Sequence, residues 1–119
     1  MRARALGRVG VPRVNVGEEQ FAFWCRTLMI PQPVRNFRFH PTRRWEIDFA
    51  WPGRKMGVEI QGGIWMGGKG AHSRPSNIQR DMDKHNALLD LGWRVWHFTP
   101  SQVRTGEAIE HMDKALRAP

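Results

Sequence analysis

Residues 45 to 61 constrain the fold more than any other stretch, because they contain two short alternating patterns on either side of a turn. Apolar residues occupy every second position from 45 to 51, and they do so again from 56 to 60. Successive side chains of a strand point to opposite faces, so each segment is predicted to be a strand with one apolar face. The intervening Gly53 and Arg54 predict a β-hairpin with a two-residue loop.

The length of that loop decides which residues of the hairpin face each other. Phe49 is expected opposite Val58 on the apolar face, and Asp48 opposite Glu59 on the other face. Directly opposed Cβ atoms lie ~4.5–5.5 Å apart, and two carboxylates at that distance repel each other unless a cation lies between them. Mg²⁺ prefers carboxylate oxygens and leaves room for water and a phosphate, and Mn²⁺ is expected to substitute for it. The alternative is a solvated face that carries ordinary surface acids.

The rest of the chain predicts three helices and two further strands around this hairpin. The resulting order is α-β-β-β-α-β-α, a mixed α/β fold with a central sheet flanked by helices. Residues 1–16 contain scattered Arg, Gly and Pro and are predicted to be a flexible basic arm, followed by one domain over residues 17–119. The segments predicted outside the hairpin are helices over 17–30, 76–91 and about 105–117, and strands over 34–39 and 93–99.

The helix predicted over residues 76–91 should bury one side. A turn of about 100° per residue puts Lys84 on or beside that side, together with Asp81 and His85. The apolar residues assigned to the buried side are Ile78, Met82, Leu88, Leu89 and Leu91. Apolar stripes also predict that four tryptophans pack in the core: Trp24, Trp45, Trp51 and Trp93.

The charge of the chain indicates a polyanionic partner. Its 19 Lys and Arg residues exceed its 11 Asp and Glu residues, which gives a formal net charge of +8. Nucleic acid is favoured over a membrane surface because no long basic amphipathic helix is visible, although a charge of this kind can also serve solubility alone. No apolar run is long enough to span a membrane and no signal peptide is visible, so we expect a cytoplasmic protein. The single Cys25 agrees with that expectation.

The hairpin resembles the core signature of the PD-(D/E)XK nucleases. The matching residues are Ile47-Asp48, a short turn, and then Val58-Glu59-Ile60-Gln61. A longer pattern is similar to small phage and bacterial endonucleases near the very-short-patch repair enzymes and the archaeal-type Holliday junction resolvases. The resemblance covers about residues 18 to 104, and it implies a restriction-endonuclease-like core and Mg²⁺-dependent hydrolysis of DNA. The residues of the longer pattern are 58–65, His72, Asp81, Lys84, Asn86 and 91–95.

The resemblance implies a role for each residue of this signature. Asp48 and Glu59 would bind the metal, and the carbonyl of Ile60 would add an oxygen. Gln61 stands where the motif has Lys, so it would orient water without supplying the usual cation. Lys84 is the candidate replacement for that cation, and the alternative is that it extends to solvent or pairs with a neighbouring acid.

The first helix carries a further candidate ligand. Resolvase-like members of the family use a Glu from this helix, and either Glu18 or Glu19 could serve. Glu19 is favoured because it lies near the edge of the buried face. Stabilisation of both acids by the helix dipole is the alternative.

Basic residues around the hairpin are the predicted DNA contacts. They include Lys69, His72 and Arg74 in the glycine-rich stretch after Gln61, and Arg43, Arg44 and Arg80 elsewhere. The glycine-rich stretch is not read as a phosphate-binding loop of the Walker type, because Gly70 follows Lys69 where Ser or Thr should ligate Mg²⁺.

The preferred substrate is branched DNA, as for a junction resolvase. A chain with one site would need to form a homodimer to make two symmetric cuts. A mismatch-nicking endonuclease of the very-short-patch type is the nearest alternative. A DNA-binding protein that retains the fold without catalysis is the alternative from another class.

Overall fold

The computed structural model describes residues 15–61 and 75–119. Its strands form one mixed sheet in the order β1-β2-β3-β4, in which the first two pairs are antiparallel and β3 is parallel to β4. The predicted α/β architecture, a central sheet flanked by helices, is therefore confirmed. The strands are β1 (Val34–Arg38), β2 (Glu46–Trp51), β3 (Met56–Ile60) and β4 (Arg94–Phe98).

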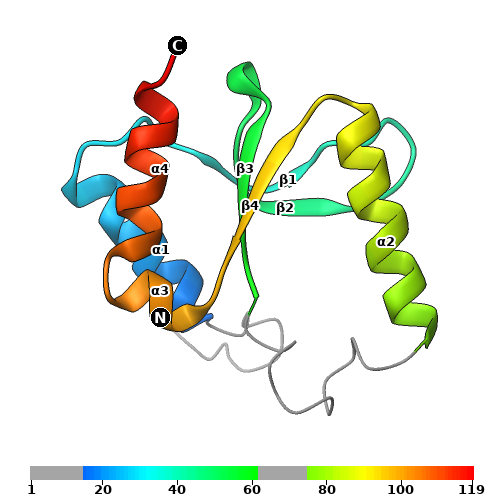
Figure 1. The fold of residues 1–119 in the computed structure, drawn as a ribbon, viewed down its shortest axis with the longest axis horizontal. Helices are drawn as coiled ribbons and strands as arrows, with labels where there is room; N and C mark the ends of the chain where they lie inside the picture. The colour runs from blue at the N-terminus through cyan, green and yellow to red at the C-terminus, as the bar shows by residue number, and fades with distance from the viewer. Residues whose placement is uncertain (1–14, 62–74) are drawn as a thin grey trace, which may run out of the picture.

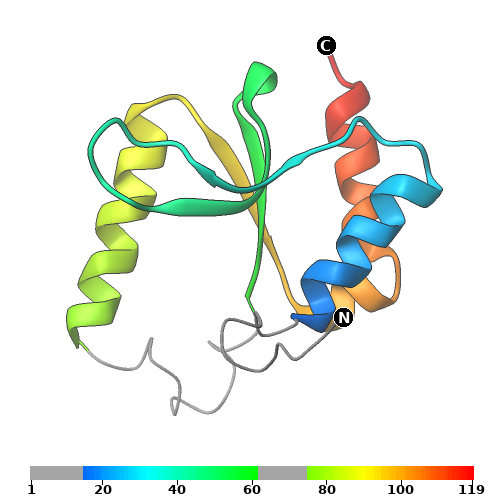
Figure 2. The same ribbon diagram turned by 180° about the vertical axis from the view of Figure 1, so that it is seen from behind.

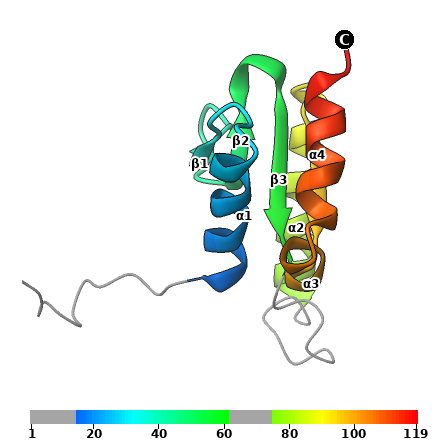
Figure 3. The same ribbon diagram turned by 90° about the vertical axis from the view of Figure 1, so that its left-hand side faces the viewer.

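Helices cover both sides of the sheet (Figures 1 and 2). Three of them pack together on one side, and Figure 3, viewed from that side, shows them in front of the fourth. The group on one side is α1 (Val16–Thr27), α3 (Pro100–Arg104) and α4 (Glu107–Arg117), and α2 (Pro75–Asp90) lies on the other. None of the helices in the described part of the chain is both long and apolar enough to cross a membrane.

The hairpin has the predicted register but not the predicted loop. Phe49 faces Val58 and Trp51 faces Met56. The connection contains four residues instead of two, because Pro52 begins a 3-10 turn that extends to Arg54. Proline lacks the backbone N–H that would extend the ladder, and Lys55 then closes the loop in the left-handed conformation with φ 50°.

The apolar face of β2 divides between two core clusters, which the alternating pattern did not predict. Phe49 and Trp51 pack in the large cluster with α1, α3 and α4, whereas Ile47 packs with Leu88 and Trp93 on the α2 side. β2 pairs with β3 only from Phe49 onward, and before that it turns away across the sheet (Figure 1). The strong twist between these strands therefore carries Ile47 to the other side.

Two helix boundaries differ from the predictions. α1 begins at Val16 and Asn15 caps it by accepting the N–H of Glu18, so the helix starts inside the stretch predicted as an arm. Residues 1–14 of that predicted arm lie outside the described residues. The final helical segment is two helices instead of one, because Thr99 forms a capping box with Gln102 and starts α3.

α2 presents a different side to the sheet from the one predicted. Leu88 is buried and Leu91, just beyond the helix, is half-buried, but Ile78, Met82 and Leu89 are 45%, 53% and 60% exposed. Only the C-terminal end of α2 joins the apolar cluster around Trp93. Lys84 lies four residues before Leu88 and so shares its inward side. The prediction of the buried side was therefore wrong for three of its five apolar residues.

Gly57 is the position at which β2 and β3 approach most tightly. A Cβ built there would lie 2.7 Å from Ile47 Cγ2 and 3.1 Å from the Phe49 carbonyl oxygen. We predict that Gly57→Ala lowers the free energy of unfolding by about 1–3 kcal/mol, because the backbone of β2 cannot move aside without loss of pairing. Urea denaturation measures this. Gly53→Ala is the matched control, since its Cβ would meet nothing within 4 Å; an equal loss in both variants would contradict the packing argument.

Candidate active site

Two carboxylates lie together where β2 and β3 separate. Asp48 lies in β2 and Glu59 in β3, and both are half-buried. The Oδ2 atom of Asp48 accepts a 2.9 Å hydrogen bond from the N–H of Ile60. This bond joins the two strands beyond the ladder pair of Phe49 and Val58, so the backbone itself holds the Asp48 side chain in the site.

Burial and neighbouring anions disfavour the charged form of Asp48. Desolvation is the largest cause and raises the pKa of this carboxyl from 3.8 to about 6. The Ile60 hydrogen bond lowers the pKa, the charges of Glu18 and Glu59 raise it, and Lys84 lowers it. Burial and the nearby Glu18 and Glu59 thus both disfavour the anionic form of Asp48, and a bound cation would favour it.

Lys84 is the cation that reaches this pair. Its Nζ donates a hydrogen bond to Oε2 of Glu59. The two side chains are only 20% and 12% exposed, so water screens this ion pair weakly. The structure thus brings the residue predicted as the substitute cation to one of the two predicted acids.

Gln61 joins the site through His97, which the sequence analysis did not identify. The Gln61 Nε2 atom lies 2.7 Å from His97 Nδ1 and 3.5 Å from Glu59 Oε1. His97 lies opposite Glu59 in the parallel pairing of β3 with β4. Desolvation is the main cause that lowers the pKa of His97, so its neutral ring can accept the Gln61 amide proton at Nδ1.

On α1, Glu18 faces the acids and Glu19 does not, contrary to the preference drawn from the sequence. The Glu19 side chain is 55% exposed and accepts a 2.8 Å hydrogen bond from Arg35. The Glu18 side chain is 18% exposed, and its pKa is raised mainly by desolvation and, to a smaller extent, by the charges of Glu19 and Glu59. Arg35 of β1, another residue that the sequence analysis missed, lies 3.8 Å from Glu18 and partly offsets its charge.

Three of the predicted DNA contacts are exposed on the surface, and the other three lie outside the described residues. Arg80 is exposed on α2, and Arg43 and Arg44 are exposed in the β1–β2 connection. Lys69, His72 and Arg74 lie outside the described residues.

Asp48 and Glu59 fit a hard divalent cation only if water or a substrate phosphate supplies the remaining oxygen ligands. Within residues 15–61 and 75–119, no three His, Cys, Asp or Glu side chains are arranged closely enough to hold a metal by themselves. Asp48 and Glu59 suit Mg²⁺, which binds through one or two carboxylates and keeps several waters. Glu18 is the nearest further acid.

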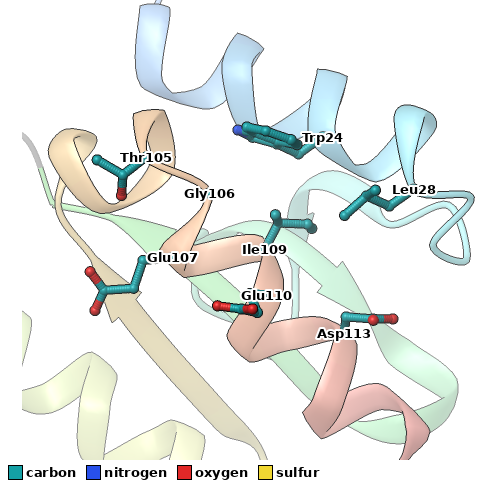
Figure 4. Close-up of a pocket in the computed structure, with 8 residues that line it drawn as sticks. All are labelled: Trp24, Leu28, Thr105, Gly106, Glu107, Ile109, Glu110 and Asp113. Carbon is teal, nitrogen blue, oxygen red and sulfur yellow. The ribbon is translucent and has the colours of Figure 1, made fainter.

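A groove elsewhere on the surface is separate from this site (Figure 4). It has a volume of about 480 Å³ and lies between α1 and the α3–α4 segment, with Trp24, Leu28 and Ile109 among its walls. Two of its acids are engaged locally, since Glu107 accepts a hydrogen bond from Gln102 and Asp113 from Arg117. None of the site residues described above lines this groove.

Two proteins of Mycobacterium tuberculosis are similar to this chain. They are "Uncharacterized protein MT2308" of strain CDC 1551 / Oshkosh and "Uncharacterized protein Rv2248" of strain ATCC 25618 / H37Rv. Each is 26% identical over an alignment of 97 residues, and the match covers 76% of this chain and 34% of the relative. The chain thus spans about a third of the length of these curated relatives. No protein-family model and no solved structure matches.

The raised pKa of Asp48 predicts a pH-dependent cost in stability. The native state holds this proton more tightly than the unfolded state, so stability falls as pH rises from about 4 through about 6. Asp48→Asn keeps an oxygen for the Ile60 N–H and removes the charge. We predict that its stability advantage over the wild type grows by roughly 2 kcal/mol between about pH 4 and about pH 7. Urea titrations at several pH values measure it, and a pH-independent difference would contradict the burial argument.

Proposed function

We propose that the protein is a Mg²⁺-dependent DNA endonuclease of the PD-(D/E)XK type, with a restriction-endonuclease-like core. One observation carries this proposal. Two carboxylates on adjacent strands, Asp48 and Glu59, lie half-buried together with Lys84 against one of them. The net charge of +8 supports a polyanionic substrate, since the rest of the chain is strongly basic while this site is acidic.

Asp48 and Glu59 hold the metal in this proposal, and the Ile60 carbonyl adds an oxygen. Glu18 takes the role on the first helix that the sequence analysis favoured for Glu19, because Glu19 is engaged by Arg35. Bound Mg²⁺, or Mn²⁺ in its place, polarises the phosphodiester and lowers the pKa of an attacking water.

Gln61 and Lys84 together replace the lysine that the motif usually contains: Gln61 orients the water and Lys84 supplies the positive charge. The Gln61 amide nitrogen is used by His97 and lies near Glu59. In this proposal its side-chain carbonyl oxygen accepts a hydrogen bond from water and orients it. Lys84 supplies the positive charge that stabilises the developing negative charge of the phosphate.

The proposed substrate is branched DNA, and the proposed assembly that cuts it is a homodimer. Arg43, Arg44 and Arg80 would contact the phosphates, together with Lys69, His72 and Arg74. Mismatch nicking and DNA binding without catalysis are the competing functions. The protein would act in the cytoplasm, where the DNA of a bacterial host lies.

The proposal predicts Mg²⁺-dependent cleavage that depends on both acids. Purified protein is incubated with linear, mismatched, flap and four-way DNA of matched sequence, and light scattering gives its oligomeric state. We expect a dimer that cuts the four-way DNA best, and no cleavage by Asp48→Asn or Glu59→Gln although both still bind DNA. Mg²⁺ should also raise the melting temperature of the wild type but not of Asp48→Asn.

Each failure in this experiment has a distinct meaning. Binding without cleavage in either metal identifies a DNA-binding protein without catalysis. A monomer that nicks mismatched duplex as well as it cuts junctions would support mismatch nicking as the function instead of junction resolution.

These two roles predict that substitutions of Lys84 and Gln61 reduce the cleavage rate to different extents. Lys84→Ala should reduce the cleavage rate by roughly 10²–10³-fold, because it removes a preorganised charge. Gln61→Ala should cost less, because water can replace an amide that only orients it. Single-turnover kinetics on saturating DNA measure both rates. Equal and small losses would show that the stabilising cation comes from another residue.

A further inference from the structure

An aromatic and cationic cluster occupies the tip of the β1–β2 hairpin, here defined as residues 39–45. Phe39 stacks on Trp45 with ring centroids 6.2 Å apart and planes 12° apart. The His40 ring contacts Trp45 edge-on at 5.3 Å. The Arg43 guanidinium lies 4.0 Å from the centre of the Trp45 ring. Trp45 is half-buried in this cluster and absent from both core clusters, so its predicted packing in the core was wrong.

The hairpin tip has a defined shape. His40 Nδ1 accepts the backbone N–H groups of Thr42 at 3.2 Å and of Arg43 at 3.0 Å, which fixes the turn. Phe39 also contacts Trp93, so the base of the tip is attached to the core on the α2 side (Figure 2). The exposed part, Pro41 to Arg44, therefore stands on a rigid support.

The charge of the hairpin tip suits a polyanion. It contains no acid, and Arg43 and Arg44 are both exposed. Arg38 at its base forms a long ion pair with Glu46, 3.8 Å between charged atoms, which leaves it largely accessible. A guanidinium stacked on an indole is a combination that proteins use to stack on bases, while its N–H groups remain available to phosphate.

The hairpin tip lies close to the acid pair along the chain. Trp45 precedes Asp48 by three residues, and three residues of extended strand span roughly 10 Å. That is the length of about three stacked base steps along one DNA strand. A base bound at the tip would therefore hold the DNA backbone within a few nucleotides of the carboxylates.

We propose that the hairpin tip is a nucleic-acid contact in which the exposed Arg43 guanidinium, held against the Trp45 ring, stacks on a base displaced from the duplex. Arg44 and Arg38 bind the adjacent phosphates. This inference rests on the proposed function for the identity of the partner as DNA, and it narrows the substrate to DNA with an unstacked base near the cut, as at a mismatch or a branch point.

Equilibrium binding without metal tests this inference separately from cleavage. Fluorescence anisotropy in EDTA measures the affinity of the full chain for an intact duplex, a mismatched duplex and a four-way junction over a range of salt. Trp45→Leu should weaken binding to the mismatched and branched DNA by about 10-fold or more, with little effect on the intact duplex. Arg44→Gln should weaken binding to all three and reduce the slope of log affinity against log salt by roughly 1. Arg43→Gln should do the same and should also remove the preference for mismatched and branched DNA.

The chain offers two matched controls. Trp45→Phe retains an aromatic ring to support Arg43 and the packing of the tip, so it should keep the preference for unstacked DNA even if Trp45→Leu disturbs the fold. Arg94→Gln removes the other Arg–Trp pair, 5.3 Å from guanidinium to ring in β4, and should leave binding unchanged.

The outcomes separate this inference from the proposed function. A wild type that shows the predicted losses but never cleaves supports the inference and refutes the endonuclease. A wild type that cleaves while Trp45→Leu affects all three DNA molecules equally, or none, overturns the inference alone. A wild type that binds none of the DNA molecules overturns both.

Discussion

The antiparallel pairing of β2 with β3 is the constraint on which the rest of the structure depends. It aligns Phe49 and Trp51 of β2 with Met56 and Val58 of β3 on the α1–α3–α4 side. In doing so it brings Asp48 to the backbone of Ile60 and close enough to Glu59 to feel its charge. Gly57 makes the approach possible because any side chain there would collide with Ile47. Where the two strands separate, the backbone ladder ends and the N–H of Ile60 donates to the Asp48 side chain instead. The core and the candidate site are therefore consequences of one register.

The electrostatics of the site oppose folding and support the proposed chemistry. Burying Asp48 near two other acids raises its pKa to about 6, which is a cost at neutral pH. Lys84 and Arg35 offset part of that cost through Glu59 and Glu18. A chain selected for stability alone would replace one of these acids with an amide. Strain of this kind is concentrated at functional sites, because the groups that bind a cation tightly are those that repel each other without it.

Local patterns predicted the hairpin well because its register depends on neighbouring residues. The pairing of Phe49 with Val58 follows from the alternation and a short loop, although Pro52 changed the form of the turn. Long-range features were harder to predict. His97 faces Glu59 through a parallel pairing that no turn specifies, so the sequence offered no signal for it.

The helices show the same limit on prediction. The choice between Glu18 and Glu19 depends on the exact rotation of α1, which the spacing of its apolar residues does not determine to within one residue. The apolar stripe of α2 misled the prediction of its buried side, because only its C-terminal end contacts the sheet. Lys84 was nevertheless identified as a site residue, since its spacing from Leu88 puts both on the same side.

Leu88 anchors the C-terminal end of α2 in the apolar cluster around Trp93, close to the site. Lys84 lies one turn before Leu88 on the same helix, and its ammonium group contacts Glu59. The position of that ammonium group therefore depends on how Leu88 packs on the other side of the sheet. The packing of the α2 side and the charge balance at the acid pair are thus coupled through a single helix.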